Sequence, residues 1–180
     1  MKAVRGPEPL LFLSKIVSKG WQRMIYSELT CKAMKIAYSA HQGQVDKAGL
    51  PYIFHPYHLA EQMTDEFSVC VALLHDVVED TGITISELQK EFPQEIVDAV
   101  EALTHVPGTG YSEYIYSVAK NPIATKVKIE DLYHNLDSTR FAGLSLVEME
   151  GWERRKVRYK KALEYLLEVE NIYSKAEETH

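Results

Sequence analysis

The segment that most constrains the fold is residues 67–80, FSVCVALLHDVVED, which is apolar on nearly every face until its second half. A helix that is hydrophobic all round belongs at the centre of a domain, where other helices cover it. This one nevertheless carries His75 and Asp76, and burying such groups without partners costs several kcal/mol. A divalent cation would remove that cost, although an isolated buried histidine is more often satisfied by hydrogen bonds. Glu79 and Asp80 follow one turn later on nearby faces.

The rest of the chain favours helix after helix, because apolar residues recur at helical spacing and no stretch shows the alternation of a strand. Thr30 is an expected N-cap, Thr84 and Glu87 form a capping box, and Pro93 suits the first position of a helix. Besides residues 67–80, the expected helices cover residues 30–42, about 57–63, 85–91, 93–103, 111–120, 122–137 and 150–170. The sequence therefore predicts an all-α fold, with one domain of roughly seven or eight helices.

Length and charge bound the possible functions. The chain has 180 residues, enough for one domain, and we divide it into an N-terminal extension (1–28) and a domain that ends in the charged C-terminal helix (29–180). The apolar run at residues 10–17 contains a lysine and is too short to cross a bilayer, so no membrane partner is expected. The formal net charge of −6 argues against a nucleic-acid partner, although a bound cation and local lysines would still admit a small anionic substrate.

The two cysteines, Cys31 and Cys70, lie in apolar stretches without C-x-x-C spacing. Two reduced, buried thiols are the simplest interpretation. The absence of a disulfide framework favours a cytoplasmic location.

A second polar cluster occurs at residues 126–137, KVKIEDLYHNLD. Lys128, Asp131 and Asn135 are spaced i, i+3 and i+7, so they share one face of a helix. An acidic side chain on a half-buried face needs a partner. That partner is either Lys128, in an ordinary ion pair, or a metal ion.

A third signal is His55, which stands before Pro56 in a loop-like stretch. Proline favours an extended backbone at the preceding residue, so the imidazole is expected at a loop-to-helix junction. His58 could compete with it, and for either histidine alone a surface position is the simpler interpretation. Two imidazoles and two carboxylates would form a mixed set of nitrogen and oxygen ligands that suits Mn²⁺, Fe²⁺, Co²⁺ or Zn²⁺. Such an ion, with open positions, activates water and neutralises a phosphoryl group.

Three blocks in this order, YIFHP at 52–56, HDVVEDT at 75–81 and KIEDLYHN at 128–135, resemble the hydrolase domain of RelA/SpoT-type (p)ppGpp hydrolases, including the small stand-alone ones. The A-x-x-x-H-x-G-Q pattern at 37–44 matches as well, and the similarity covers about residues 31–140. A lone His-Asp dipeptide is a weak signal, but the order and spacing of all the blocks make a specific one.

The resemblance implies a single HD-type helical domain with one Mn²⁺-like ion, for which Fe²⁺, Co²⁺, Zn²⁺ and Ni²⁺ are alternatives. The implied metal ligands are His55, His75, Asp76 and Asp131. The implied catalytic pair, which activates water and transfers protons, is Glu79 and Asp80. The implied substrate-binding residues are Lys47, Lys128 and Asn135, while His41 and His134 would support the site or pack around it. The implied reaction removes pyrophosphate from the 3′ position of the small nucleotide (p)ppGpp, and the chain could form a homo-oligomer.

Two positions depart from the family pattern. Asp46 and Asp137 stand where the family usually has basic residues that help to hold the guanine nucleotide. A carboxylate pointing inward would repel phosphate. The alternatives are therefore an HD phosphohydrolase acting on another nucleotide or phosphoester, or a non-catalytic HD module that binds a nucleotide.

A basic stretch, ERRKVRYKK at residues 153–161, stands out in an acidic protein. We expect a solvated helix face or a surface between subunits. The functional alternative is an entrance that attracts phosphates.

Overall fold

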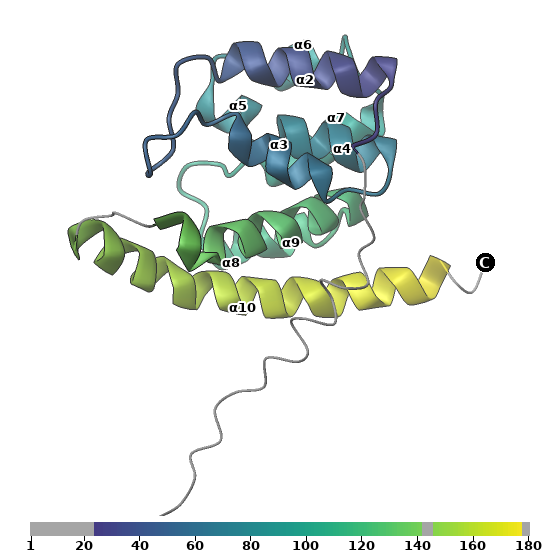
Figure 1. The fold of residues 1–180 in the computed structure, drawn as a ribbon. Helices are drawn as coiled ribbons and strands as arrows, with labels where there is room; N and C mark the ends of the chain where they lie inside the picture. The colour runs from purple at the N-terminus through teal and green to yellow at the C-terminus, as the bar shows by residue number, and fades with distance from the viewer. Residues whose placement is uncertain (1–23, 142–145, 178–180) are drawn as a thin grey trace, which may run out of the picture.

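The structure is a computed structural model that describes residues 24–141 and 146–177 (Figure 1). Within these ranges the chain forms helices and no strand, which confirms the all-α prediction. The proposed extension at residues 1–28, with its apolar run at 10–17, lies mostly outside the described residues, so that boundary stays a prediction. The elements are α2 (Glu28–Ala40), α3 (Phe54–Glu61), α4 (Glu66–Leu74), α5 (Val77–Asp80), α6 (Ile85–Leu88), α7 (Gln94–Leu103), α8 (Tyr111–Val118), α9 (Pro122–Leu136), the 3-10 helix η1 (Ser138–Phe141) and α10 (Leu146–Glu177).

Helix α4 forms the centre of the core, as its apolar sequence predicts. Every residue from Ser68 to Leu74 is buried, and α4 contacts α2, α3, α7 and α9. Figure 1 shows the order of the layers, with α2 at one side, α3, α4 and α7 in the middle, and α8 and α9 between them and the long α10. The core is therefore built around the same helix that leads to His75 and Asp76.

The segment predicted as one helix over residues 67–80 forms two. Helix α4 ends at Leu74 and α5 begins at Val77, and Asp76 between them has φ −100° and ψ −3°, away from regular helical values. Neighbouring side chains of a straight helix point about 100° apart. The break brings the side chains of His75 and Asp76 together, and no glycine or proline in the sequence signals it.

Several helix starts differ from the predicted ones. Ser27, not Thr30, is the N-cap of α2, and Thr30 is the third helical residue, whose side chain completes the capping box. Pro93 is the N-cap of α7 rather than its first residue. Helix α3 begins at Phe54, so His55 lies in its first turn and not in the preceding loop. The capping box of Thr84 and Glu87 is confirmed.

The loop between α2 and α3 folds back on itself at the mouth of the site. The backbone N–H of Asp46 donates to Leu50 O (2.8 Å) and that of Tyr52 donates to Gln44 O (3.0 Å). Gly43 and Gly49 have φ of 81° and 78°, a region that side-chain-bearing residues rarely adopt. These two glycines therefore allow the tight return of the loop.

Helix α10 extends along α8 and α9 and is longer than the predicted 150–170. Trp152 and Leu166 are buried, and the Tyr173 hydroxyl donates to Ala119 O (2.7 Å). None of the described helices is both long enough and apolar enough to cross a membrane.

Candidate metal centre and its cleft

Three side chains that could bind a metal ion come from two places in the chain and meet beside the core. His55 comes from the first turn of α3, and His75 and Asp76 come from the junction of α4 and α5. Their ligand atoms lie within 4.8 Å of one another. Asp76 Oδ2 is 2.8 Å from His75 Nε2 and 3.7 Å from His55 Nε2. Among the described residues these three side chains form a group that could hold a metal ion.

The orientation of His75 favours a cation at this point. Its Nδ1–H donates to Ala72 O (2.8 Å), so in the neutral ring the lone pair is on Nε2. Nε2 is buried, and the polar atom that the structure places beside it is Asp76 Oδ2 at 2.8 Å. Burial disfavours the charged ring, yet Asp76 and Asp131 raise the pKa of His75 to about 9. The carboxylates thus favour positive charge next to His75 Nε2, and a divalent cation would supply that charge.

His55 is held from behind by a second imidazole. Its Nδ1 lies 2.7 Å from His134 Nδ1, and the two rings stack. Burial, with His55 and Arg140 nearby, lowers the pKa of His134 to about 3, so His134 is neutral and can accept the proton of His55 Nδ1. That arrangement leaves the Nε2 lone pair of His55 facing the carboxylates. His58, the predicted competitor, instead stacks on His134 with ring centroids 4.5 Å apart.

Asp131 adjoins this group from α9. Its Oδ1 is 3.3 Å from His55 Nε2 and accepts a hydrogen bond from Asn135 Nδ2, while its Oδ2 is 2.7 Å from Lys128 Nζ. Burial opposes ionisation of Asp131, but Lys128 and His55 hold its pKa well below the ordinary value. The sequence leaves two alternative partners for Asp131, Lys128 or a metal ion. In the structure Asp131 pairs with Lys128 and also lies beside the His55–His75–Asp76 group.

Tyr52, which the sequence does not single out, reaches the same carboxylate cluster. Its hydroxyl donates to Asp76 Oδ2, and its ring packs against those of His41 and His55. Burial and the charge of Asp76 raise the pKa of Tyr52, so the phenol remains a proton donor. The sequence signal that could have identified Tyr52 is its position as the first residue of the YIFHP block.

Glu79 and Asp80, the predicted catalytic pair, line the cleft beside Asp76. Glu79 Oε2 accepts from the backbone N–H of His105 (2.9 Å). The backbone carbonyl of Asp80 accepts from Gln44 Nε2 (2.9 Å). Burial and the charge of Asp76 raise the pKa of Asp80, so its carboxyl holds a proton more readily than an ordinary aspartate.

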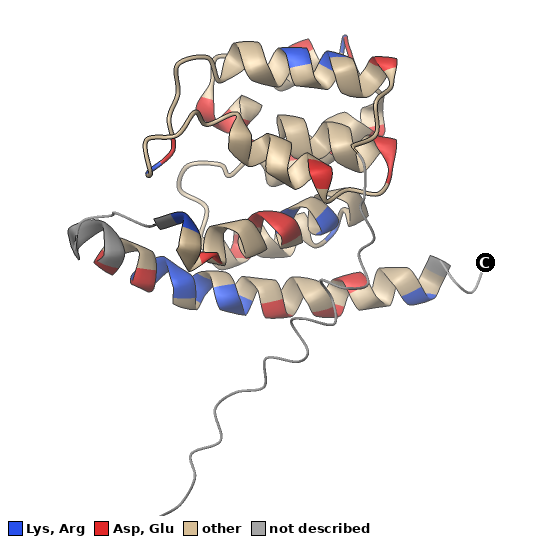
Figure 2. Ribbon diagram, viewed as in Figure 1, with Lys and Arg blue, Asp and Glu red and all other residues tan. Residues whose placement is uncertain are grey.

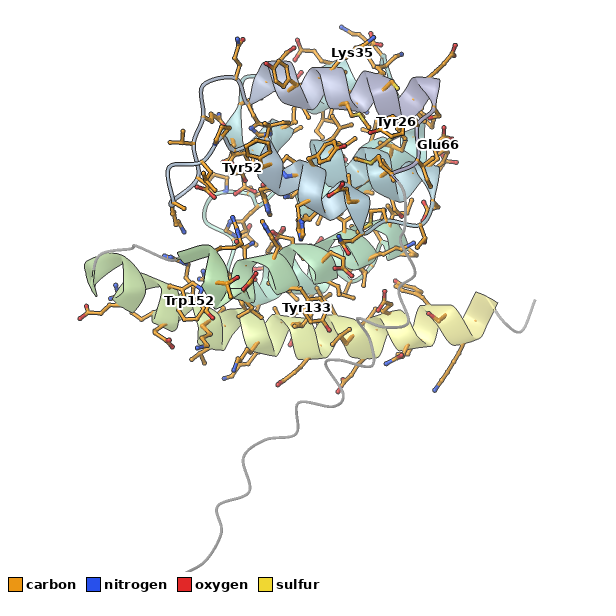
Figure 3. The ribbon with its side chains drawn as sticks, viewed as in Figure 1. Tyr26, Lys35, Tyr52, Glu66, Tyr133 and Trp152 are labelled. Carbon is orange, nitrogen blue, oxygen red and sulfur yellow. The ribbon has the colours of Figure 1, made fainter. Side chains whose placement is uncertain are left out.

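The cleft has a volume of about 610 Å³, within the range of small-molecule sites. Tyr52 borders it from the α2–α3 loop and Trp152 from α10 (Figure 3). Its cationic lining consists of Lys47, Lys128, Arg140, Arg155 and Arg158. Its aromatic lining includes Tyr111, Tyr114, Trp152 and Tyr159. The three predicted substrate-binding residues Lys47, Lys128 and Asn135 thus all reach the cleft.

Arg155 and Arg158 belong to the basic stretch at 153–161, for which an entrance that attracts phosphates was the less favoured interpretation. Both line the cleft, and the Arg158 guanidinium lies 4.3 Å from the centroid of the Tyr111 ring. The Tyr111 hydroxyl is buried without a hydrogen-bond partner. The sequence reveals the charge of this stretch but not the rotation of α10 that turns these arginines inward.

Asp46 and Asp137, the two acidic residues at positions where the family usually has basic ones, have different surroundings. Asp46 lines the cleft and pairs with Arg140 at 3.2 Å. Asp137 is the C-cap of α9, does not line the cleft, and accepts hydrogen bonds from the N–H and hydroxyl of Thr139. Only one of the two carboxylates therefore faces the place where a phosphate would enter.

Comparisons with known proteins identify the family of this domain. A family model described as "HD domain" matches residues 33–132. A probable GTP pyrophosphokinase of Mycobacterium leprae is 36% identical over 123 residues, which are 61% of this chain and 16% of that protein. A guanosine-3′,5′-bis(diphosphate) 3′-pyrophosphohydrolase of Spiroplasma citri is 37% identical over 120 residues, 58% of this chain and 16% of that protein. The chain thus spans about one sixth of the length of these curated relatives.

A solved structure supports the fold. It is described as "A metazoan ortholog of SpoT hydrolyzes ppGpp and plays a role in starvation responses". Its TM-score is 0.59 at 22% identity, and the match covers 81% of this chain and 97% of that one. The family model covers more than half of the sequence and spans His55, His75, Asp76 and Asp131. The chain belongs to the HD domain family.

Proposed function

We propose that this protein is a metal-dependent phosphohydrolase that removes pyrophosphate from the 3′ position of (p)ppGpp. The observation that carries the proposal is the convergence of His55, His75 and Asp76, whose ligand atoms lie within 4.8 Å of one another beside a cleft lined by both acidic and basic side chains. Relatives from Synechocystis and Spiroplasma citri are named guanosine-3′,5′-bis(diphosphate) 3′-pyrophosphohydrolases, the first of them as probable. The names of these relatives are the basis for the proposed substrate. The residues of the site are the basis for the proposed metal-dependent hydrolysis.

The residues that would hold the metal are His55, His75, Asp76 and Asp131, with Mn²⁺ the first candidate and Fe²⁺, Co²⁺, Zn²⁺ or Ni²⁺ the alternatives. When bound, such an ion lowers the pKa of water and neutralises charge on a phosphoryl group. The imidazole–imidazole contact behind His55 and the Ala72 carbonyl behind His75 fix the two rings in position.

We assign the proton transfers to Glu79 and Asp80. Hydrolysis needs one group that takes a proton from the attacking water and another that returns a proton to the leaving oxygen. Asp80, with its raised pKa, suits the donor, and Glu79, oriented by the His105 N–H, suits the acceptor. Lys47, Lys128 and Asn135 line the cleft around the substrate. We further propose that residues 29–180 form the hydrolase unit, that it acts in the cytoplasm, and that residues 1–28 are an extension.

The direct test incubates the purified protein with Mn²⁺ and a panel of ppGpp, pppGpp, NADPH, deoxynucleoside triphosphates and nucleoside monophosphates. We expect ppGpp to yield GDP and pyrophosphate. Turnover of another member with ppGpp untouched would support a phosphohydrolase of different substrate. Binding of ppGpp without any product would support a non-catalytic nucleotide-binding module.

Metal binding should also stabilise the fold. An ion present at about a hundred times its Kd adds about 2.7 kcal/mol to the free energy of unfolding, which corresponds to a rise in Tm of roughly 5–10 °C for a domain of this size. Differential scanning calorimetry of chelator-treated protein with and without Mn²⁺ measures this. An unchanged Tm at saturating Mn²⁺ would contradict the claim that the folded protein binds this ion. The same measurement with Mg²⁺ serves as the comparison.

His134 allows a test of whether its contact with His55 Nδ1 matters for metal binding. Replacing it by phenylalanine keeps a ring against His58 but removes the acceptor for His55 Nδ1. We expect Mn²⁺ affinity to fall about 10- to 100-fold, the usual cost of losing such a partner. His58→Phe is the matched control, because His58 stacks on His134 and does not belong to the His55–His75–Asp76 group. Equal metal affinity in wild type and His134→Phe would argue against this role.

A further inference from the structure

Asp46 is an acidic residue in the wall of a cleft proposed to receive an anion. A carboxylate there repels phosphate unless another group neutralises it. Its Oδ2 lies 3.2 Å from an Nη atom of Arg140, and the two side chains are only 16% and 20% exposed. The pair joins the α2–α3 loop to η1, which are 94 residues apart in the sequence.

Both members of this pair are fixed by other contacts. Asp46 Oδ1 accepts from the backbone N–H groups of Ala48 (2.9 Å) and Leu50 (3.0 Å), which holds the carboxylate within its own loop. Arg140 also donates to His134 O (3.2 Å), near the end of α9. The guanidinium therefore contacts both the loop and α9, and Asp46 is one of the groups that hold it in place.

Two more cations lie around this pair. Lys47 follows Asp46 in the loop and Arg155 comes from α10, and both line the cleft with Arg140. Burial and the charges of Arg155 and Arg140 lower the pKa of Lys47, in keeping with the place of all three side chains in the lining of one cleft. Figure 2 shows basic residues of the loop, of η1 and of α10 on the same side of the molecule. Three cations around one carboxylate form a site with net positive charge, which attracts an anion.

We propose that Arg140, held in the cleft by Asp46, binds the second, 5′-diphosphate of the nucleotide together with Lys47 and Arg155. The inference rests on the proposed function, because the scissile 3′-diphosphate is assigned to the His–Asp group and the other diphosphate must lie elsewhere in the cleft. Asp46 is then a positioning residue that acts through Arg140. The acidic departure at this position changes how the nucleotide is held and does not prevent its binding.

The test uses Asp46→Asn, because asparagine keeps the Oδ1 acceptor for Ala48 and Leu50 and removes only the charge toward Arg140. GDP is the probe, since it carries the 5′-diphosphate and lacks the 3′ group that is hydrolysed. Its Kd for the Mn²⁺-loaded protein is measured by titration calorimetry, beside KM and kcat for ppGpp. Arg140→Gln and the double variant complete the cycle, and Asp137→Asn, outside the cleft, is the control.

We expect Asp46→Asn and Arg140→Gln each to weaken GDP binding and to raise KM about five- to tenfold, with kcat changed by less than about twofold. The double variant should lose little more than Arg140→Gln alone, because the two residues act as a unit. Asp137→Asn should match wild type. If Arg140→Gln lowers the melting temperature, Arg140→Lys serves as the second variant. It keeps the positive charge, so it should bind GDP more tightly than Arg140→Gln does.

The sign of the Asp46→Asn effect decides the proposal. If Asp46 merely repels phosphate, removing its charge tightens GDP binding, and that result overturns the inference. Failure of the wild-type protein to bind GDP overturns it as well. Failure of the proposed function has a different signature, namely no turnover of ppGpp while the GDP titrations still show the expected pattern.

Discussion

An Asp76→Asn variant is expected to lose both its metal and its activity, with kcat/KM for ppGpp reduced by on the order of 10³ or more. The substitution keeps the shape of the side chain but removes the charge that faces His75 Nε2 at 2.8 Å and His55 Nε2 at 3.7 Å. It also changes the acceptor of the Tyr52 hydroxyl. Elemental analysis of the purified variant and initial rates with added Mn²⁺ measure the two losses.

The matched control is Asp98→Asn on α7, whose exposed carboxylate accepts only a hydrogen bond from Gln94 among the contacts of the described residues. It should retain metal and activity. An Asp76→Asn protein that remains folded, carries one ion per chain and turns over ppGpp at the wild-type rate would contradict the assigned site. Far-ultraviolet circular dichroism establishes that the variant is folded.

Glu79→Gln and Asp80→Asn should separate catalysis from metal binding. Each is expected to lower kcat about 10²- to 10⁴-fold, the usual contribution of a positioned acid or base, while metal content stays at the wild-type level. The reason is geometric, since both carboxylates line the cleft and neither belongs to the His55–His75–Asp76 group. Single-turnover rates with ppGpp and elemental analysis give the two quantities.

These two variants also distinguish an enzyme from a binding module. A protein that only binds nucleotide has no use for either carboxylate, so its affinity for ppGpp would be unchanged and no rate would be lost. If both variants hydrolyse ppGpp like wild type, other residues transfer the protons. If they lose the metal instead, Glu79 and Asp80 help to hold the ion.

The helices, and the shared face of Lys128, Asp131 and Asn135, follow from local patterns in the sequence. The apolar run before His75 specifies a buried helix whatever surrounds it, and the i, i+3, i+7 spacing of Lys128, Asp131 and Asn135 places them on one face. The contacts of these three side chains agree with that expectation. Such features depend on the spacing of residues within one helix, and that spacing can be read directly from the sequence.

The features that the sequence misses depend on how elements pack against one another. The break between α4 and α5 has no glycine or proline to mark it, and it arises where His75 and Asp76 turn together toward His55. The inward rotation of Arg155 on α10 and the pairing of Asp46 with Arg140 each join segments far apart in the chain. The charge of Asp46 read in isolation suggests repulsion of phosphate, whereas the structure pairs this carboxylate with Arg140.

The most direct measurement of the central claim is the anomalous difference density of a crystal soaked in Mn²⁺. We predict one strong peak within bonding distance of His55 Nε2, His75 Nε2 and a carboxylate oxygen of Asp76, with Asp131 beside it. A peak elsewhere, or none at this point while the side chains keep their positions, would contradict it.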